Sequence, residues 1–179
     1  MSITISGKEL SAALKGKGII ISSYQNIGTV KDISVFLADC KESFYVPITS
    51  NNCSIVILSK EGFIRLCKKL GWTRVTRKEL EQIFVLMHEI GHAKCGPSES
   101  TADEYALSNT NERIRIKAIY SQMVAWYGLE EKTIDQQATF WANFAGLLEQ
   151  NDPHKTVFRF EVMSYALSEL KKLQKKMNG

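Results

Sequence analysis

The hydrophobic positions in the first 60 residues follow the short, dense pattern that is typical of β-strands. Runs rich in β-branched and aromatic residues occur at 18–23, 33–38, 44–48 and 54–59. Turn-prone stretches such as 24–28 and 49–52 separate these runs. One amphipathic helix is expected before the strands, from Lys8 to Lys15. Because Pro47 has no backbone N–H, its strand is expected to lie at a sheet edge or to end there.

After residue 60 the hydrophobic positions recur at helical spacing. The expected helices are 60–70, ended by Gly71; a long helix from a capping box at Thr76–Glu79 to about Cys95; 111–127, ended by Gly128; a helix opened by a second capping box at Thr133 and Gln136; and a long helix after Pro153. Their apolar stripes are more typical of core packing than of a cofactor site. The fold class predicted is therefore α+β, with a small sheet and one helix in about 1–59 and a mostly helical half in about 60–179.

Composition narrows the class of protein further. The chain has 179 residues, of which 44% are hydrophobic and 23% charged, which is typical of one soluble globular domain. Its four cysteines form no CxxC pair, and neither a signal-like segment nor a membrane-length apolar run occurs, so a cytoplasmic location is expected. The net charge of +4 comes without any mixed basic and aromatic motif, so nucleic acid is not an expected partner.

Two of the three histidines lie four residues apart, in the sequence HEIGH from His88 to His92. On a helix this spacing places both imidazoles on one face, where they can bind one metal ion. Glu89 projects from the same turn and can take a proton from a metal-bound water. This is the HExxH arrangement of zinc peptidases, in which zinc lowers the pKa of the water and polarises the scissile carbonyl.

A catalytic zinc also needs a third protein ligand and an open position. Gly96 and Pro97 favour an end to the histidine helix, after which the chain can reverse and bring Glu99 toward the metal. Asp103 would lie one turn beyond Glu99 on a second helix and can accept the outer N–H of a ligating histidine. We predict Glu99 as ligand and Asp103 as the supporting residue. Asp103 or Glu104 could replace Glu99 as ligand, and Cys95 is a weaker alternative because a thiolate tends to close a structural site.

HEIGH followed by ESTADEYA (99–106) resembles the gluzincin metallopeptidases, which pair HExxH with a downstream ExxAD on a second helix. The compact form, with a small sheet before the active-site helix, is similar to the minigluzincins and the ImmA/IrrE-like peptidases of phages and mobile elements. The Ste24/HtpX-like proteases share both motifs but have membrane-spanning helices. The resemblance implies a single zincin-like domain over 1–179 that binds one Zn²⁺ through His88, His92 and Glu99. It further implies that Glu89 is the general base and that Asp103 supports the ligands. The spacing from His92 to Glu99 is shorter than is usual in these families.

The resemblance also implies that an extended protein or peptide substrate pairs with a strand of the sheet. The candidate edge strand is 54–59, and the alternative is that 54–59 is an ordinary core strand. A donor that stabilises the oxyanion is expected as well. His154, Arg159, Tyr105 and Tyr120 are candidates for this role, with His154 in a segment that resembles part of the HtpX-like group.

The function predicted is therefore a zinc-dependent metalloendopeptidase that cleaves a specific regulatory protein. The alternative is a catalytically inactive, zincin-like interaction module, encoded by a phage or mobile element, in which the old site serves only as scaffold. A third class, metal-dependent hydrolases of other amides such as peptide deformylase, lacks support because the cysteine segment of that enzyme is missing.

Overall fold

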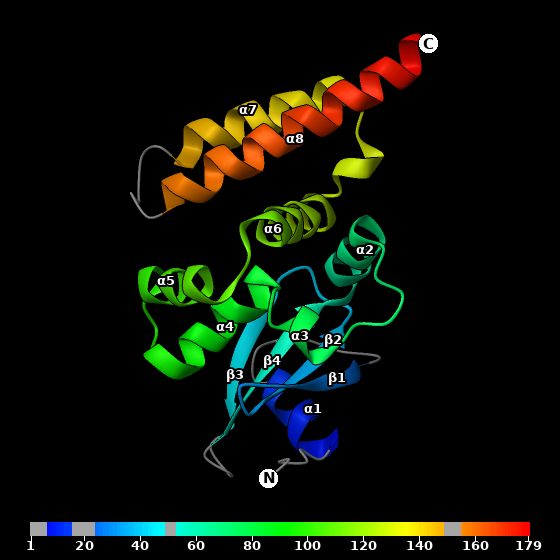
Figure 1. Cartoon of the computed structure of the whole chain (residues 1–179). Coiled ribbons are helices and arrows are strands. Elements are labelled where there is room, and N and C mark those ends of the chain that lie inside the picture. The colour runs from blue at the N-terminus through cyan, green and yellow to red at the C-terminus, as the bar shows by residue number, and fades with distance from the viewer. Residues whose placement is uncertain (1–6, 16–23, 49–52, 149–154) are drawn as a thin grey trace.

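The computed structural model describes residues 7–15, 24–48, 53–148 and 155–179. A four-stranded sheet in the N-terminal part is followed by a mostly helical half, which confirms the predicted α+β class (Figure 1). The first elements are α1 (Gly7–Lys15), β1 (Tyr24–Val30), β2 (Ile33–Ala38), β3 (Phe44–Ile48) and β4 (Cys53–Ser59). The helices that follow are α2 (Lys60–Leu70), α3 (Arg77–Leu80), α4 (Phe84–Cys95), α5 (Glu99–Asn109), α6 (Glu112–Tyr127), the 3₁₀ turn η1 (Leu129–Glu131), α7 (Ile134–Leu148) and α8 (Lys155–Asn178). No helix in the described part of the chain is long and apolar enough to cross a membrane.

The strand order in the sheet is β1-β2-β4-β3, with β2 and β4 parallel and the two outer pairs antiparallel. The candidate edge strand 54–59 is therefore wrong, because β4 lies between β2 and β3. The physical reason is that Ile55, Val56, Ile57 and Leu58 are all buried, so both faces of β4 need apolar cover. The edge beside β4 is β3, which carries Pro47 as predicted.

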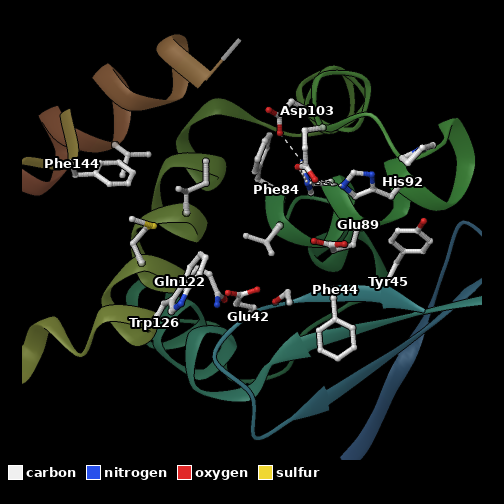
Figure 2. A pocket seen from close by; sticks show the side chains of 18 residues that line it. Glu42, Phe44, Tyr45, Phe84, Glu89, His92, Asp103, Gln122, Trp126 and Phe144 are labelled. Atoms are coloured by element: carbon white, nitrogen blue, oxygen red, sulfur yellow. Dashed lines mark hydrogen bonds and ion pairs between the residues drawn. The ribbon is translucent and has the colours of Figure 1, made fainter. Parts of the chain in front are cut away.

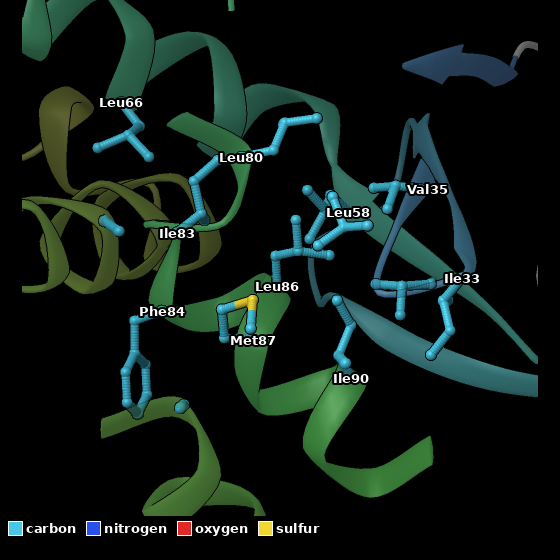
Figure 3. Close-up of a cluster of buried hydrophobic side chains, with 14 of the residues drawn as sticks. Ile33, Val35, Leu58, Leu66, Leu80, Ile83, Phe84, Leu86, Met87 and Ile90 are labelled. Carbon is cyan, nitrogen blue, oxygen red and sulfur yellow. The ribbon is translucent and has the colours of Figure 1, made fainter. Parts of the chain in front are cut away.

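Both faces of the sheet are covered by helices. Alternate residues of β2 and β4 pack on one side against α1, in a cluster that includes Leu10, Phe36 and Ile57. The other side faces α4, whose Leu86, Met87 and Ile90 meet the sheet at residues such as Val35 and Leu58 (Figure 3). The core thus fixes one face of α4 and leaves its opposite face to carry polar groups.

The stretch 24–28 differs from the prediction, because it forms part of β1 and is not a turn. The predicted strand 18–23 lies outside the described residues and stays a prediction. Lys31 and Asp32 both have positive φ, 50° and 66°, and join β1 to β2 as a two-residue hairpin. Such a turn usually contains glycine or asparagine, so the sequence carries no clear signal for it.

The long helix expected from Thr76 to Cys95 is interrupted. Its capping box is confirmed, with the Glu79 backbone N–H donating to Thr76 Oγ1 at 3.3 Å and the Thr76 N–H donating to Glu79 Oε2 at 2.7 Å. However, α3 ends at Leu80 and α4 begins only at Phe84. Leu80 and Ile83 are both buried on either side of the break, so the change of direction lets both side chains reach the core.

The other predicted helices are present. Gly71 and Gly128 adopt the left-handed conformation just after α2 and α6, and Thr133 and Gln136 exchange capping hydrogen bonds at the start of α7. The antiparallel pair α7–α8 packs on α6 around the buried Trp141 (Figure 1). Pro153, predicted to precede the last helix, lies outside the described residues.

The contact between α4 and α5 depends on Gly91, the glycine of HEIGH. A Cβ at this position would lie 2.9 Å from Ala102 Cα and 3.0 Å from the Ala102 carbonyl oxygen. Both are backbone atoms, which cannot move aside as a flexible side chain can. Gly91 therefore lets the two helices approach more closely than any other residue would allow.

Replacing Gly91 by alanine is expected to destabilise the fold. Alanine favours a helix by about 1 kcal/mol over glycine, but overpacking a tight contact costs about 1–3 kcal/mol, so the free energy of unfolding should fall. Urea unfolding followed by circular dichroism measures the change. Lys94→Ala, at an exposed position of the same helix, serves as control and should change stability by less than about 0.5 kcal/mol. A Gly91→Ala protein as stable as the wild type would contradict the close-packing argument.

Candidate metal centre

The two histidines of HEIGH point into one site. His88 and His92 lie one turn apart on α4, and their Nε2 atoms are 3.1 Å apart. The rings are perpendicular, with centroids separated by 4.7 Å. The i and i+4 spacing on α4 thus brings the same nitrogen of each ring to a common point.

The turn after α4 returns Glu99 to that point. Gly96 has a φ of 102°, which ends the helix, and the Ser98 side chain caps α5 by accepting from the Thr101 N–H. Glu99 is therefore the first residue of α5. Its Oε2 lies 3.1 Å from His88 Nε2 and its Oε1 lies 3.3 Å from His92 Nε2. The short spacing in the sequence is thus compatible with convergence, because α4 and α5 are packed closely.

The outer nitrogen of each ring has an acceptor. Nδ1–H of His92 donates to the carbonyl oxygen of Gly96 at 3.2 Å. Nδ1–H of His88 donates to Asp103 Oδ1 at 2.7 Å, and Figure 2 shows this bond as a dashed line that starts at Asp103. A carbonyl can only accept, so the proton of the neutral His92 ring belongs on Nδ1. In the neutral rings both Nε2 atoms then carry lone pairs, which face each other and the Glu99 carboxylate.

This donor set fits a zinc ion. Three acceptors that face one another repel unless a cation lies between them. Tetrahedral zinc, with Zn–N distances of about 2.0–2.1 Å, holds neighbouring ligand atoms about 3.3 Å apart. The separations of 3.1, 3.1 and 3.3 Å among His88, His92 and Glu99 are close to this value. Two imidazoles and one carboxylate would leave a fourth position open.

The carboxylates around His88 raise the pKa of its imidazole. Burial lowers the pKa of this imidazole, but the Asp103 hydrogen bond and the charges of Glu89, Asp103 and Glu99 together outweigh burial. The pKa of His88 therefore lies above its ordinary value of 6.5. A negative surrounding of this kind also favours a bound cation.

Glu89 lines a cavity of about 650 Å³ that opens beside the two histidines. The cavity wall includes side chains that sequence reasoning missed, among them Tyr45 of β3, whose ring stacks on His92 with centroids 5.5 Å apart. Glu42 and Gln122 also line it, and the Gln122 side chain donates to the Lys41 carbonyl oxygen at 2.7 Å. No local motif marks these residues, because their meeting depends on the sheet order and on the packing of α6.

The remaining predicted residues either are not described by the structure or lie away from the site. His154 lies outside the described residues, and the side chain of Arg159 is not described either. Tyr120 faces a different pocket, between α2 and α6, and Tyr105 does not line the cavity beside the histidines. Cys95 and Glu104 are exposed and stand outside the group formed by the two histidines and Glu99.

Comparison with known proteins agrees with this arrangement. Residues 75–138 match the family model of Peptidase M78, described as the IrrE N-terminal-like domain. This segment contains α3 to α6 and the start of α7, and with them both histidines, Glu89, Glu99 and Asp103. The match confirms the resemblance to the ImmA/IrrE-like zincin metallopeptidases. Searches of curated proteins and of solved structures found no match to the chain.

We expect substitutions around the two histidines to weaken zinc binding in a graded way. Asp103→Asn removes a charged acceptor from His88 and should lower zinc affinity by about 10- to 100-fold. Glu99→Gln replaces the predicted ligand carboxylate by a neutral amide and should lower zinc affinity further. Competition with a chromogenic chelator measures each affinity. Glu104→Gln, a neighbouring exposed carboxylate on α5, is the matched control, and a loss there as large as for Glu99→Gln would contradict the ligand assignment.

Zinc binding is also expected to weaken in acid. Zinc needs neutral imidazoles, and the raised pKa of His88 means that protons begin to compete at a higher pH than at an ordinary histidine. Apparent zinc affinity should therefore fall as pH decreases from about 8 to about 5.5, by about tenfold per unit for each proton displaced. In Asp103→Asn the fall should begin at lower pH, because the largest raising influence is gone. An affinity independent of pH over this range would contradict the prediction.

Proposed function

We propose that the protein is a zinc-dependent metalloendopeptidase in which His88, His92 and Glu99 hold the metal and Glu89 is the general base. The observation that carries the proposal is the convergence of two Nε2 atoms and a carboxylate, within 3.3 Å, at the wall of a cavity that Glu89 also lines. The match of residues 75–138 to a peptidase family supports the same reaction class.

The sheet supports a peptide substrate. β3 is the outer strand beside β4, and its Phe44 and Tyr45 line the cavity next to Glu89. Among the strands that the structure describes, β3 pairs with β4 alone, and an extended peptide can add to such an edge as a further strand. A peptide bound in this way would run along the cavity and past the two histidines. We therefore propose a protein or peptide substrate that binds in an extended conformation.

Glu89 carries the proton through the reaction. When bound, zinc lowers the pKa of water toward neutrality and polarises the scissile carbonyl. Glu89 accepts a proton from the attacking water, whose oxygen forms a bond with the carbonyl carbon. Glu89 then returns this proton to the peptide nitrogen as the C–N bond breaks, so the products are a carboxylic acid and an amine. Asp103 acts on the reaction only through His88, by keeping its ring oriented.

The alternative is an inactive interaction module with the same fold. It differs from the proposal in what it requires of Glu89. A scaffold needs the packing of α4 against the sheet, which Leu86, Met87 and Ile90 supply, but it does not need a carboxylate at the cavity. A conservative change of Glu89 therefore separates the two functions.

Glu89→Gln is expected to abolish cleavage and to leave zinc bound. The amide keeps the shape of the side chain but cannot accept the proton, which should cost about 10²- to 10⁴-fold in rate. Zinc-loaded wild-type protein and variant are incubated with a peptide library made by digesting a whole proteome, and mass spectrometry identifies new termini. Zinc content is measured in parallel by elemental analysis.

Glu104→Gln is again the matched control and should cleave as the wild type does. Removing zinc with a chelator should stop cleavage, and adding zinc should restore it. If zinc-loaded wild type creates no new termini, or if Glu89→Gln cleaves at the wild-type rate, the peptidase proposal fails. The first of these results would favour the interaction module.

A further inference from the structure

The cavity beside the histidines continues into an apolar chamber. On α6, Ile119, Met123 and Trp126 follow at spacings of four and three residues, which places them on one face of the helix. Across the chamber, the wall is completed by Phe84 and Val85 of α4, Phe144 of α7 and Val162 of α8. Figure 2 shows Trp126 and Phe144 on one side of the cavity and His92 and Tyr45 on the other, with Glu89 between them.

Several of these apolar side chains are not fully buried. Val85, Ile119, Trp126 and Phe144 all remain partly exposed although they lie within the body of the molecule. An apolar surface that faces a cavity rather than the core is typical of a binding site. The volume of about 650 Å³ falls within the range of about 300–1,000 Å³ that ligand pockets occupy.

The charges of the residues that line the cavity limit the kinds of substrate side chain that can bind in it. The charged carboxyl side chains that line the cavity are Glu42, Glu89, Glu99 and Asp103, and no lysine or arginine is among the described lining residues. An acidic side chain would therefore be repelled. Glu42 and Gln122 are polar groups at the side of the chamber, but against the wall formed by Met123, Phe144 and Val162 an amide or a hydroxyl would lose its hydrogen bonds to water.

We propose that this chamber is the specificity pocket of the enzyme and accepts a large apolar side chain of the substrate, such as that of leucine, methionine or phenylalanine. The inference rests on the proposed peptidase function, because it places the apolar side chain beside the bond that Glu89 and the metal would attack. A residue in the chamber is next to the scissile bond because the chamber and the histidines belong to one continuous cavity.

Part of the chamber wall is formed by helices that lie outside the segment matched by the family. Phe144 and Val162 lie beyond residue 138, where the family match ends, on the helices α7 and α8. Lys69 of α2 is paired with Glu169 of α8 at 2.9 Å, which helps to hold the pair of helices over the cavity. The chemistry thus lies in the matched segment, and part of the substrate selection lies outside it.

The test uses two series of small probes that differ only in their side chain. N-acetyl hydroxamates of glycine, alanine, aspartate, leucine and phenylalanine bind through the metal, and isothermal titration calorimetry measures their affinity for the zinc-loaded protein. The matching N-acetyl amides carry no chelating group, and ligand-detected NMR measures their binding to the same protein without added zinc. In both series, the leucine and phenylalanine probes should bind about 10- to 100-fold more tightly than the alanine probe, and the aspartate probe should bind most weakly.

Two variants test whether the chamber wall causes the preference for large apolar side chains. Trp126→Ala and Phe144→Ala, each checked for folding by circular dichroism, should reduce the advantage of leucine and phenylalanine over alanine by about fivefold or more. The matched control is Leu167→Ala, an exposed apolar residue of α8 that does not line the chamber, and it should leave the advantage unchanged.

The two probe series separate the pocket from the catalytic proposal. If the protein binds no zinc but the amides still show the preference, the peptidase proposal fails and the pocket stands. If all side chains bind equally in both series, or if the preference survives in both wall variants, the pocket inference is overturned. In that case zinc binding and Glu89-dependent cleavage would remain valid.

Discussion

The close contact of α4 and α5 at Gly91 is the constraint on which the candidate site depends. Gly91 stands between the two histidines in the sequence, so the helices come together at the level of the histidine rings. A larger residue would push α5 outward by its backbone, and Glu99 and Asp103 would move with it. Because Glu99 meets both Nε2 atoms and Asp103 meets the outer nitrogen of His88, one displacement would break all the contacts that α5 makes with the two rings.

The sheet supports α4 on the side that faces away from α5. Leu86, Met87 and Ile90 bury one side of α4 against β2 and β4, which fixes the rotation of the helix about its own axis. With that rotation set, His88, Glu89 and His92 must face the other way, toward α5 and the cavity. Burying two imidazoles and a carboxylate would be costly if they lacked partners, and here each ring has an acceptor for Nδ1–H. The apolar half of α4 therefore determines where its polar half can act.

Sequence reasoning succeeded where a signal is local. A few neighbouring residues are enough to predict the capping boxes at Thr76 and Thr133 and the glycines that end α2 and α6. The common face of the two histidines in HEIGH likewise follows from their spacing on a helix. It failed where the outcome depends on distant partners. The hairpin turn at Lys31 and Asp32 is held by strand pairing, the break before Phe84 by the need to bury two side chains, and the order of β3 and β4 by cover from both sides of the sheet. Tyr45 and Trp126 were missed for the same reason, since they meet the cavity only after the whole fold forms.

The residues of the candidate metal centre are close together in the sequence, whereas the residues of the cavity wall come from distant elements. The residues that would bind metal and transfer protons lie within 12 positions from His88 to Glu99, on two helices whose contact tolerates little variation. The surfaces that would meet a substrate come from β3, α6, α7 and α8, of which β3 and α6 contact α4 directly. Phe144 and Trp126 line the cavity but take part in none of the hydrogen bonds and ion pairs described for His88 and His92. In the proposed enzyme, selectivity could therefore vary while the chemistry stays constant, because most of the cavity wall lies on other elements than the two histidines and Glu99.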